Sequence, residues 1–231
     1  MQKNTPSITF PHPDTADPDG LLAYGGNLEV ETLLSAYSQG IFPWYSDNSP
    51  ILWWSPNPRL VLFPDEHKVS KSLMQKIKKH LFEIRVDENF EKVIQNCAKV
   101  DRKGQQGTWI TFEMQQAYIN LHQTGYAHSV EVYHHDMLIG GLYGVSIGKV
   151  FFGESMFYTE TDASKIALYY LVKLLKKNKY KLIDAQQSTK HLKSLGAREI
   201  TRNKFLEIIR VATQQKGIEG KWNVSSISDD P

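Results

Sequence analysis

Apolar residues recur at helical spacing through much of the first 122 residues of the chain. In a helix, apolar positions three or four residues apart form one stripe that faces the core. The pattern predicts helices at 29–39, 68–79, 89–98 and 110–122, and a short strand at 83–86. Gly40 ends the first helix, and a polar loop occupies 101–107.

From residue 129 the period shortens to two, which is typical of strands. Segments at 129–134, 137–145 and 149–153, joined by short turns, predict an antiparallel meander. The elements that follow are a helix at 163–177 with Thr161-Asp162 as its N-cap, a buried strand at 181–185, and helices at 191–195 and 203–214. The tail from Gly217 is polar and is expected to be loose.

This order of elements predicts an α+β protein with an acetyltransferase-like (GNAT) fold, in which a mixed sheet carries flanking helices. In acetyltransferases, a glycine-rich segment ahead of the helix that follows the meander holds the pyrophosphate of coenzyme A through backbone N–H groups. The corresponding segment here, 160–165, has no glycine and contains Asp162. We therefore expect no coenzyme A cofactor.

Prolines at positions 56, 58 and 64 indicate a boundary between two parts of the chain. At 231 residues the chain is long for one small domain and short for two large ones. We expect a small N-terminal domain at 1–60 and a larger acetyltransferase-like domain at 61–231.

With 41% hydrophobic and 23% charged residues, the composition is that of a soluble globular protein with a packed core. Apolar runs are too short to cross a bilayer, and residues 1–11 lack the pattern of a signal peptide. The single cysteine, Cys97, excludes an internal disulfide and fits a reducing compartment. The eight histidines lack metal-ligand spacing. We expect a cytoplasmic protein with no membrane span and no metal.

The net charge is only +2, but the charges are unevenly distributed. The first 60 residues carry two basic and six acidic side chains, so the basic excess lies in the rest of the chain. It concentrates in lysine-rich runs at 68–79 and 173–181. Each run alone fits a solvated helix face. Together they fit a surface that contacts RNA phosphates, with Lys71, Lys76 and Lys78 as the candidate residues.

Several tryptophans lie where prolines break the chain. Trp44 follows Pro43, and Trp53 and Trp54 precede Pro56, so these rings are expected on turns rather than inside a periodic element. An indole held by a rigid turn is suited to stacking on a nucleic-acid base. Each ring taken alone also fits an ordinary core position.

Asp184 lies in the apolar strand predicted at 181–185. A carboxylate is costly to bury without a partner, so Asp184 is the strongest single candidate for a site residue on physical grounds. The alternative is a structural ion pair with one of the nearby lysines.

Longer motifs occur along most of the chain. The N-terminal ones are Phe10-Pro11, Gly20 to Gly26, Ala36 to Trp44 and Trp53 to Arg59. Those that follow are Thr108 to Ile110, Ala127 to Glu131, Gly140 to Gly144, Gly153 to Phe157, Ala163 to Lys165, Ile183 to Gln186 and His191 to Ala197. In order and spacing, up to about Leu206, they resemble the leucyl/phenylalanyl-tRNA–protein transferase family. The chain departs from the family at Ala185, where Cys is common, and in the spacer at 187–190.

The resemblance implies an enzyme that moves Leu or Phe from aminoacyl-tRNA onto the N-terminal Arg or Lys of acceptor proteins, marking them for N-end-rule degradation. The expected partners are Leu-tRNA, Phe-tRNA and those proteins, with no cofactor and no membrane, and we expect a monomer. An aminoacyl ester is already activated, so transfer requires positioning of the amine more than a covalent enzyme intermediate.

The resemblance also implies the site residues. Trp44 and Trp109 correspond to aromatic residues near the 3′ adenosine, where stacking tolerates any base. A pocket that admits Leu and Phe but excludes β-branched side chains corresponds to Leu142, Phe151, Met156, Leu168, Leu171 and Ile183. Each of these six taken alone also fits a core position.

Glu154, Asp184 and Gln186 form the polar, catalytic set that the resemblance implies. An aspartate with a pKa of about 3.9 is a weak base for an amine near 8. We expect Gln186 to orient the amine or the ester carbonyl, and Asp184 to attract the cationic N-terminus. The leaving 3′ oxygen or a neighbouring ribose hydroxyl would then take the proton.

Other functions remain open at this point. A tRNA-dependent transferase acting on another amine, such as a cell-wall peptide, would share fold and donor, although the motifs at 53–54 and 153–156 argue against it. A small-molecule N-acetyltransferase would need the pyrophosphate loop that is missing. A non-catalytic RNA-binding module would need only the basic helices and the stacking rings.

Overall fold

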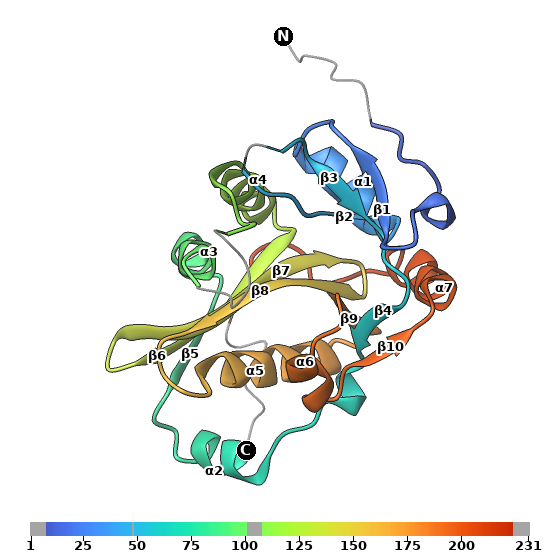
Figure 1. The fold of residues 1–231 in the computed structure, drawn as a ribbon. Coiled ribbons are helices and arrows are strands. Elements are labelled where there is room, and N and C mark those ends of the chain that lie inside the picture. The colour runs from blue at the N-terminus through green and yellow to red at the C-terminus, as the bar shows by residue number, and fades with distance from the viewer. Residues whose placement is uncertain (1–7, 48, 101–107, 224–231) are drawn as a thin grey trace.

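The computed structural model describes residues 8–47, 49–100 and 108–223. The polar loop expected at 101–107 and the tail beyond residue 223 lie outside them. The described strands form one three-stranded and one seven-stranded sheet (Figure 1). No helix in these ranges is long and apolar enough to cross a membrane.

The larger sheet has the order β10-β4-β9-β8-β7-β6-β5. Its strands are β4 (Arg59–Leu62), β5 (Glu83–Val86), β6 (Ala127–His134), β7 (Met137–Ile147), β8 (Val150–Tyr158), β9 (Leu182–Gln186) and β10 (Arg198–Ile200). Neighbouring strands pair antiparallel, except that β8 and β9 are parallel. The sheet is therefore mixed, as the sequence predicts.

Helices cover both faces of this sheet (Figure 1). They are α2 (Lys71–Ile77), α3 (Phe90–Ala98), α4 (Phe112–Gln123), α5 (Ala163–Lys177), α6 (Lys190–Ser194) and α7 (Arg202–Ala212). Side chains alternate between two cores, as they must along a strand. On β8, Phe152 packs into the core that contains α3 and α4, whereas its neighbour Phe151 packs into the core that contains α5.

The N-terminal part consists of the small sheet β1-β3-β2 and the helix α1 (Val30–Ser38). Its strands are β1 (Leu21–Tyr24), β2 (Phe42–Pro43) and β3 (Leu52–Trp54). Buried residues of this part, such as Leu33 and Trp53, belong to the same core as Phe152 and the residues of α3 and α4. The N-terminal part thus shares a core with α3 and α4 on one face of the large sheet, and α1 contacts β7.

Most predicted elements form within two residues of the expected positions, and α5 and β5 occupy the predicted ranges. Strands β1, β2 and β3 of the small sheet and strands β4 and β10 were not predicted, and β8 continues five residues beyond the expected end at 153. Asp162 is the N-cap residue of α5, but its carboxylate caps no N–H group because it binds Lys76 and Lys165. The expectation of a loose tail from Gly217 is wrong as far as residue 222, since the indole of Trp222 is 1% exposed.

Candidate active site

The seven-stranded sheet opens between β8 and β9. The two strands pair over only three positions, from Val150 opposite Leu182 to Phe152 opposite Asp184. Beyond them, β8 stays paired with β7 and β9 stays paired with β4, but they no longer bond to each other. Glu154 and Met156 of β8 and Gln186 of β9 follow this point, so their side chains lie in the gap.

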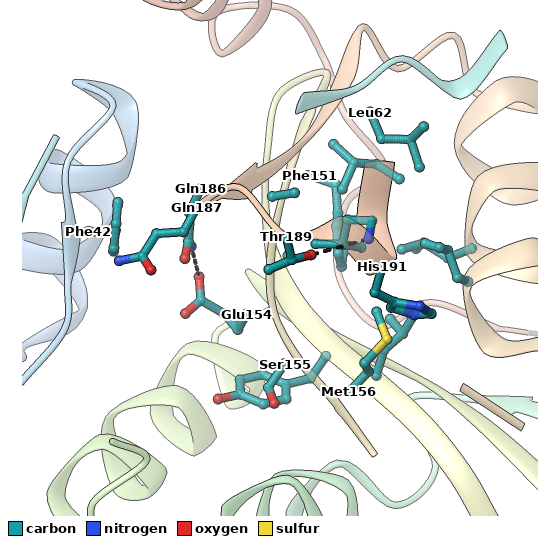
Figure 2. Close-up of a pocket in the computed structure, with 18 of the residues that line it drawn as sticks. Phe42, Leu62, Phe151, Glu154, Ser155, Met156, Gln186, Gln187, Thr189 and His191 are labelled. Carbon is teal, nitrogen blue, oxygen red and sulfur yellow. Dashed lines mark hydrogen bonds between the residues drawn. The ribbon is translucent and has the colours of Figure 1, made fainter. Parts of the chain in front are cut away.

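A cavity of about 460 Å³ occupies this gap (Figure 2). The sheet contributes much of the wall through β4, β7, β8 and β9, and the loops and helices around it complete the lining. Outside the residues predicted for the site, the lining consists of Phe42, Pro43, Leu62, Tyr143, Gly153, Ser155, Ala185, Gln187, Thr189, His191 and Leu192.

The six residues predicted for the aminoacyl pocket all line this cavity: Leu142, Phe151, Met156, Leu168, Leu171 and Ile183. They come from β7, β8, α5 and β9 and belong to, or pack against, the core on the α5 side of the sheet. Met156 is half-buried, and the other five are almost fully buried. One end of the cavity is therefore apolar and is shaped by side chains that the core holds in place.

Trp44 and Trp109 line the same cavity and are both half-buried. The ring of Trp44 lies edge-on to that of Trp54, with centroids 5.5 Å apart, and the Trp54 indole N–H donates to the carbonyl of Trp44. Trp53, in contrast, is buried in the core and donates to the carbonyl of Gly25 at 2.9 Å. The expectation that Trp53 and Trp54 lie on turns is wrong, because both belong to strand β3. Of these three tryptophans, only Trp44 lines the cavity.

Glu154 is the carboxylate of the cavity, and three side chains bind it. The hydroxyl of Tyr37, from α1, donates to Oε1 at 2.7 Å, and that of Tyr118, from α4, donates to Oε2 at 2.9 Å. The amide Nε2 of Gln186 donates to Oε1 at 3.0 Å (Figure 2). Three elements far apart in the chain therefore fix the position of this carboxylate.

Burial raises the pKa of Glu154 to about 7, and the hydrogen bonds from Tyr37 and Tyr118 counteract part of that rise. Burial, together with the charge of Glu154, raises the pKa of both tyrosines well above 10, so they remain neutral donors. The two hydroxyls also contact each other.

Asp184 is fully buried and is not among the residues that line the cavity. Its carboxylate forms a bidentate ion pair with Arg59, with Nε–Oδ1 at 2.8 Å and Nη2–Oδ2 at 2.7 Å. The guanidinium lies between the rings of Phe42 and Phe205, at 4.7 and 4.6 Å from their centroids. The partner of Asp184 is thus a buried arginine rather than a nearby lysine.

Asp184 also holds Gln186. Its Oδ1 accepts the backbone N–H of Gln186 at 2.9 Å, and Gln186 has a φ of 60°, which is uncommon outside glycine. This contact stabilises a backbone conformation that would otherwise be unfavourable. In this conformation the side-chain amide of Gln186 points toward Glu154.

The candidate tRNA lysines lie on or next to α2, outside the cavity. Lys71 and Lys78 are exposed. The Nζ of Lys76 lies 2.9 Å from a carboxylate oxygen of Asp162 and donates to the carbonyl of Thr161. Only Lys71 and Lys78 of the three are therefore fully presented to solvent.

Sequence reasoning missed Tyr37, Tyr118 and Arg59. Both tyrosines occupy the apolar stripes of predicted helices, where they read as core residues. Arg59 stands in the proline-rich boundary segment, and nothing local indicates that it is buried. Exposed residues at the cavity rim were also missed: Gln187 and Thr189 follow the last strand residue in an irregular segment, and His191 lies in the short helix α6.

Comparison with known proteins identifies close relatives. The profile of the family described as leucyl/phenylalanyl-tRNA protein transferase matches residues 61–210, and that of its N-terminal domain matches residues 26–57. The leucyl/phenylalanyl-tRNA–protein transferase of Maridesulfovibrio salexigens is 54% identical over 214 residues, covering 92% of this chain and 89% of its own.

Two further relatives carry the same name. That of Syntrophus aciditrophicus is 54% identical over 94% of this chain and 90% of its own, and that of an Anaeromyxobacter species is 52% identical over 93% and 92%. Among solved structures, L-PGS from Bacillus licheniformis aligns with a TM-score of 0.38 at 13% identity, covering 70% of this chain and 52% of its own. That similarity is too low to support an argument.

Proposed function

The chain belongs to the leucyl/phenylalanyl-tRNA protein transferase family and is an aminoacyltransferase, and on this premise we propose how its cavity carries out the transfer. The donor is Leu-tRNA or Phe-tRNA, and the acceptor is the N-terminal Arg or Lys of a protein, which the added residue marks for N-end-rule degradation. The observation that carries the proposal is one cavity with an apolar end, two half-buried indoles and a single carboxylate with a pKa near 7.

We assign the apolar end to the donor side chain and the indoles to the 3′ adenosine. An unbranched Cβ lets Leu or Phe enter between Met156 and Phe151, whereas a β-branched side chain collides with the wall. Trp44 and Trp109 supply stacking surface that recognises the base without reading its identity. The ester carbonyl of the donor then lies in the gap between the strands, within reach of Glu154 and Gln186.

The acceptor amine arrives as an ammonium ion, because an α-amine has a pKa near 8. We propose that ionised Glu154 attracts it and takes one proton, which later passes to water. The neutral amine attacks the ester carbonyl carbon, and a C–N bond forms. As the bond to the ribose 3′ oxygen breaks, that oxygen takes the second proton from the nitrogen. A base with a pKa near 7 is well matched to the first of these steps.

Gln186 and Asp184 have positioning roles in this scheme. Gln186 fixes Glu154 through its Nε2, and we propose that its amide oxygen accepts a hydrogen bond from the amine. The charge of Asp184 is neutralised by Arg59. We therefore propose that Glu154, and not Asp184 as expected from the sequence, attracts the cationic amine. Asp184 acts through the backbone of Gln186.

Three coarser features belong to the same proposal. The larger domain, 61–231, has an acetyltransferase-like fold: a meander followed by α5, with a parallel pair, β8 and β9, that separates after three residues. The small N-terminal domain, 1–60, closes one wall of the cavity with Phe42 and Trp44. One chain forms the whole described cavity, which supports action as a monomer, and the buried Cys97, which forms no disulfide, supports a cytoplasmic location.

The tRNA body is proposed to lie against α2. Lys71 and Lys78 would contact phosphates of the acceptor stem without reading bases, while Lys76 braces α2 against Asp162 at the start of α5.

The direct test is incubation of the protein with tRNA carrying radiolabelled Leu and a peptide that starts with Arg. Label should appear on the peptide. The matched control is the same peptide with an acetylated N-terminus, which has no free amine and should stay unlabelled. Tight tRNA binding without any label on the Arg peptide would contradict the proposed activity and favour a binding module.

A further inference from the structure

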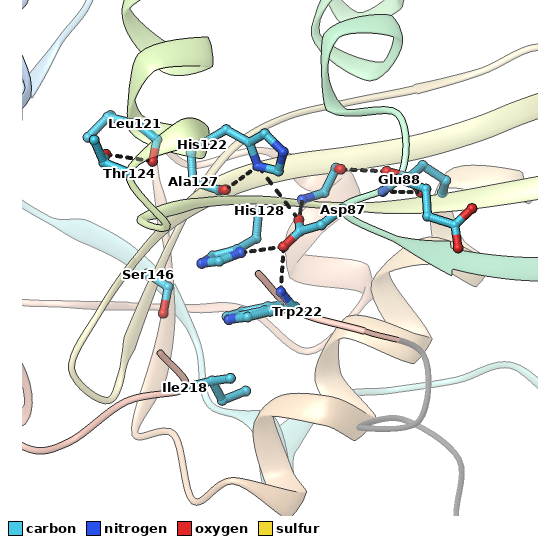
Figure 3. A network of polar contacts seen from close by, with 12 residues as sticks. Asp87, Glu88, Leu121, His122, Thr124, Ala127, His128, Ser146, Ile218 and Trp222 are labelled. Atoms are coloured by element: carbon cyan, nitrogen blue, oxygen red, sulfur yellow. Dashed lines mark hydrogen bonds and ion pairs between the residues drawn. The ribbon is translucent and has the colours of Figure 1, made fainter. Parts of the chain in front are cut away.

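The segment 217–222, which follows α7, is anchored to the sheet through Asp87 (Figure 3). The backbone N–H of Trp222 donates to Oδ2 of Asp87 at 2.8 Å, and Nδ1 of His128 lies 2.7 Å from the same oxygen. The other oxygen of Asp87 accepts the backbone N–H of Ser129 at 2.8 Å. The indole of Trp222 stacks on the imidazole of His128, with centroids 3.9 Å apart and planes at 8°. A buried carboxylate on the turn after β5 thereby fixes Trp222 against β6.

The indole of Trp222 also contacts the wall of the aminoacyl pocket. Its ring centroid lies 5.9 Å from that of Phe151, and both rings are about 1% exposed. Phe151 covers Gly144 so closely that a Cβ there would lie 2.5 Å from its ring. The ring of Phe151 therefore has Gly144 and Trp222 as neighbours, and it lines the cavity. Trp222 belongs to the same core cluster as Phe151, Leu142 and Ile183.

We propose that Trp222 is a specificity-determining positioning residue, which sets the depth of the aminoacyl pocket by holding Phe151 from behind. The proposal rests on the assignment of this pocket under Proposed function. Protein interiors are packed so densely that removing a supporting ring lets its neighbour shift into the space left. A retreat of Phe151 would deepen the pocket and admit larger donor side chains.

Trp222 comes from a different part of the chain than the residues that line the pocket. The six predicted pocket residues all lie within 61–210, the range that the family profile matches, whereas Trp222 lies beyond it. The backbone around Trp222 is held at further points: the N–H of Ile218 donates to the hydroxyl of Tyr180 at 3.3 Å, and Gly217 lies against Gly148. Residues 217–222 can thus keep the indole of Trp222 in place while Phe151, on the pocket side, contacts the donor side chain.

The test compares transfer rates from Leu-tRNA and from tRNA charged with Trp, a larger donor, onto one Arg-started peptide. In Trp222→Ala the ratio of the Trp rate to the Leu rate should rise by roughly fivefold to tenfold. This is smaller than the full discrimination that an apolar pocket obtains from the fit of one side chain. Trp222→Phe should stay near wild type. Because the readout is a ratio, the fraction of unfolded protein cancels. If Trp222→Ala yields no soluble protein, Trp222→Leu is judged by the same criterion.

Two further variants separate the inference from a general loss of stability and from the pocket assignment. Ile94→Ala removes an equally buried side chain from the other core and should leave the ratio unchanged. Phe151→Ala should raise the ratio, and adding Trp222→Ala to it should raise it little further, since the two act through one ring. An unchanged ratio in Trp222→Ala with a raised one in Phe151→Ala overturns the brace. An unchanged ratio in both overturns the pocket itself.

Discussion

Gln186 and Glu154 meet across the opening between β9 and β8, where Nε2 of the amide donates to Oε1 of the carboxylate at 3.0 Å. One partner is held from behind by Asp184 and the other by Tyr37 and Tyr118. The reacting amine is proposed to enter beside this pair. The residues around the pair therefore decide both where the amine is held and how strongly Glu154 binds a proton.

Asp184→Ala should lower both stability and transfer, because it leaves the charge of Arg59 buried without a partner. The free energy of unfolding should fall by about 3–5 kcal/mol in a urea titration. Gln186→Ala, which breaks no buried ion pair, should change stability little. Its transfer rate should nevertheless fall on the order of a hundredfold, because misplacement by a small distance is that costly. An Asp184→Ala protein as stable as wild type would remove the structural role assigned here.

Tyr37→Phe and Tyr118→Phe should each raise the pKa of Glu154, because each removes a hydrogen bond that lowers it. Glu154 must be ionised to take the amine proton, so the acidic limb of the pH–rate profile should move to higher pH. Transfer at pH 6 should fall, and transfer at pH 9 should approach wild type. Tyr45→Phe is the control, since that hydroxyl binds Glu113 instead. A limb displaced toward lower pH would refute the role of the two tyrosines.

Met156→Ala should weaken discrimination against β-branched donors while leaving the chemistry intact. Met156 lines the apolar end of the cavity and is only half-buried, so its loss enlarges the pocket without opening the core. One side chain's worth of fit is about 1–3 kcal/mol, so the Leu:Val ratio of kcat/KM should fall by roughly tenfold or more. An unchanged ratio would exclude Met156 from the donor pocket.

Lys71→Gln combined with Lys78→Gln should weaken tRNA binding and reduce its salt dependence, with a slope in log Kd against log salt smaller by about two. Binding of a short aminoacyl-adenosine should be unaffected, whereas Trp44→Ala should weaken it. The charge-matched control is Lys92→Gln with Lys99→Gln on the α3 side of the sheet, which should leave the slope unchanged. Equal losses for tRNA and the short analogue would contradict separate sites for stem and adenosine.

Local patterns predicted those parts of the fold whose signals are local. The amphipathic stripe of α5 and the alternation in β6 and β7 placed the pocket residues on the elements that carry them. The end of β8 was missed because Glu154 and Ser155 interrupt the apolar run. What makes a carboxylate acceptable there is a pair of hydroxyls 117 and 36 residues away in sequence.

The short strand β4 was missed for a related reason. Arg59 begins β4 and is buried only because Asp184, 125 residues later, neutralises it. Trp222 was read as part of a loose tail, since the partners that bury it, Asp87 and His128, lie in distant segments. Sequence reasoning therefore named much of the cavity lining but, apart from Asp184, not the residues that hold it in place.

The central claim, that Glu154 takes the proton of the acceptor amine, is tested most directly by the pH dependence of kcat in wild type and Glu154→Gln. Gln keeps the shape of Glu but cannot titrate; its amide oxygen can accept from one tyrosine, and its amide nitrogen can donate to the hydroxyl oxygen of the other. In wild type, transfer should fall as pH falls through about 7, where Glu154 becomes protonated. In Glu154→Gln, the limb near pH 7 should be replaced by one near the pKa of the amine, about 8, and the rate should fall on the order of a hundredfold or more. A limb with the same midpoint in both proteins would contradict the claim.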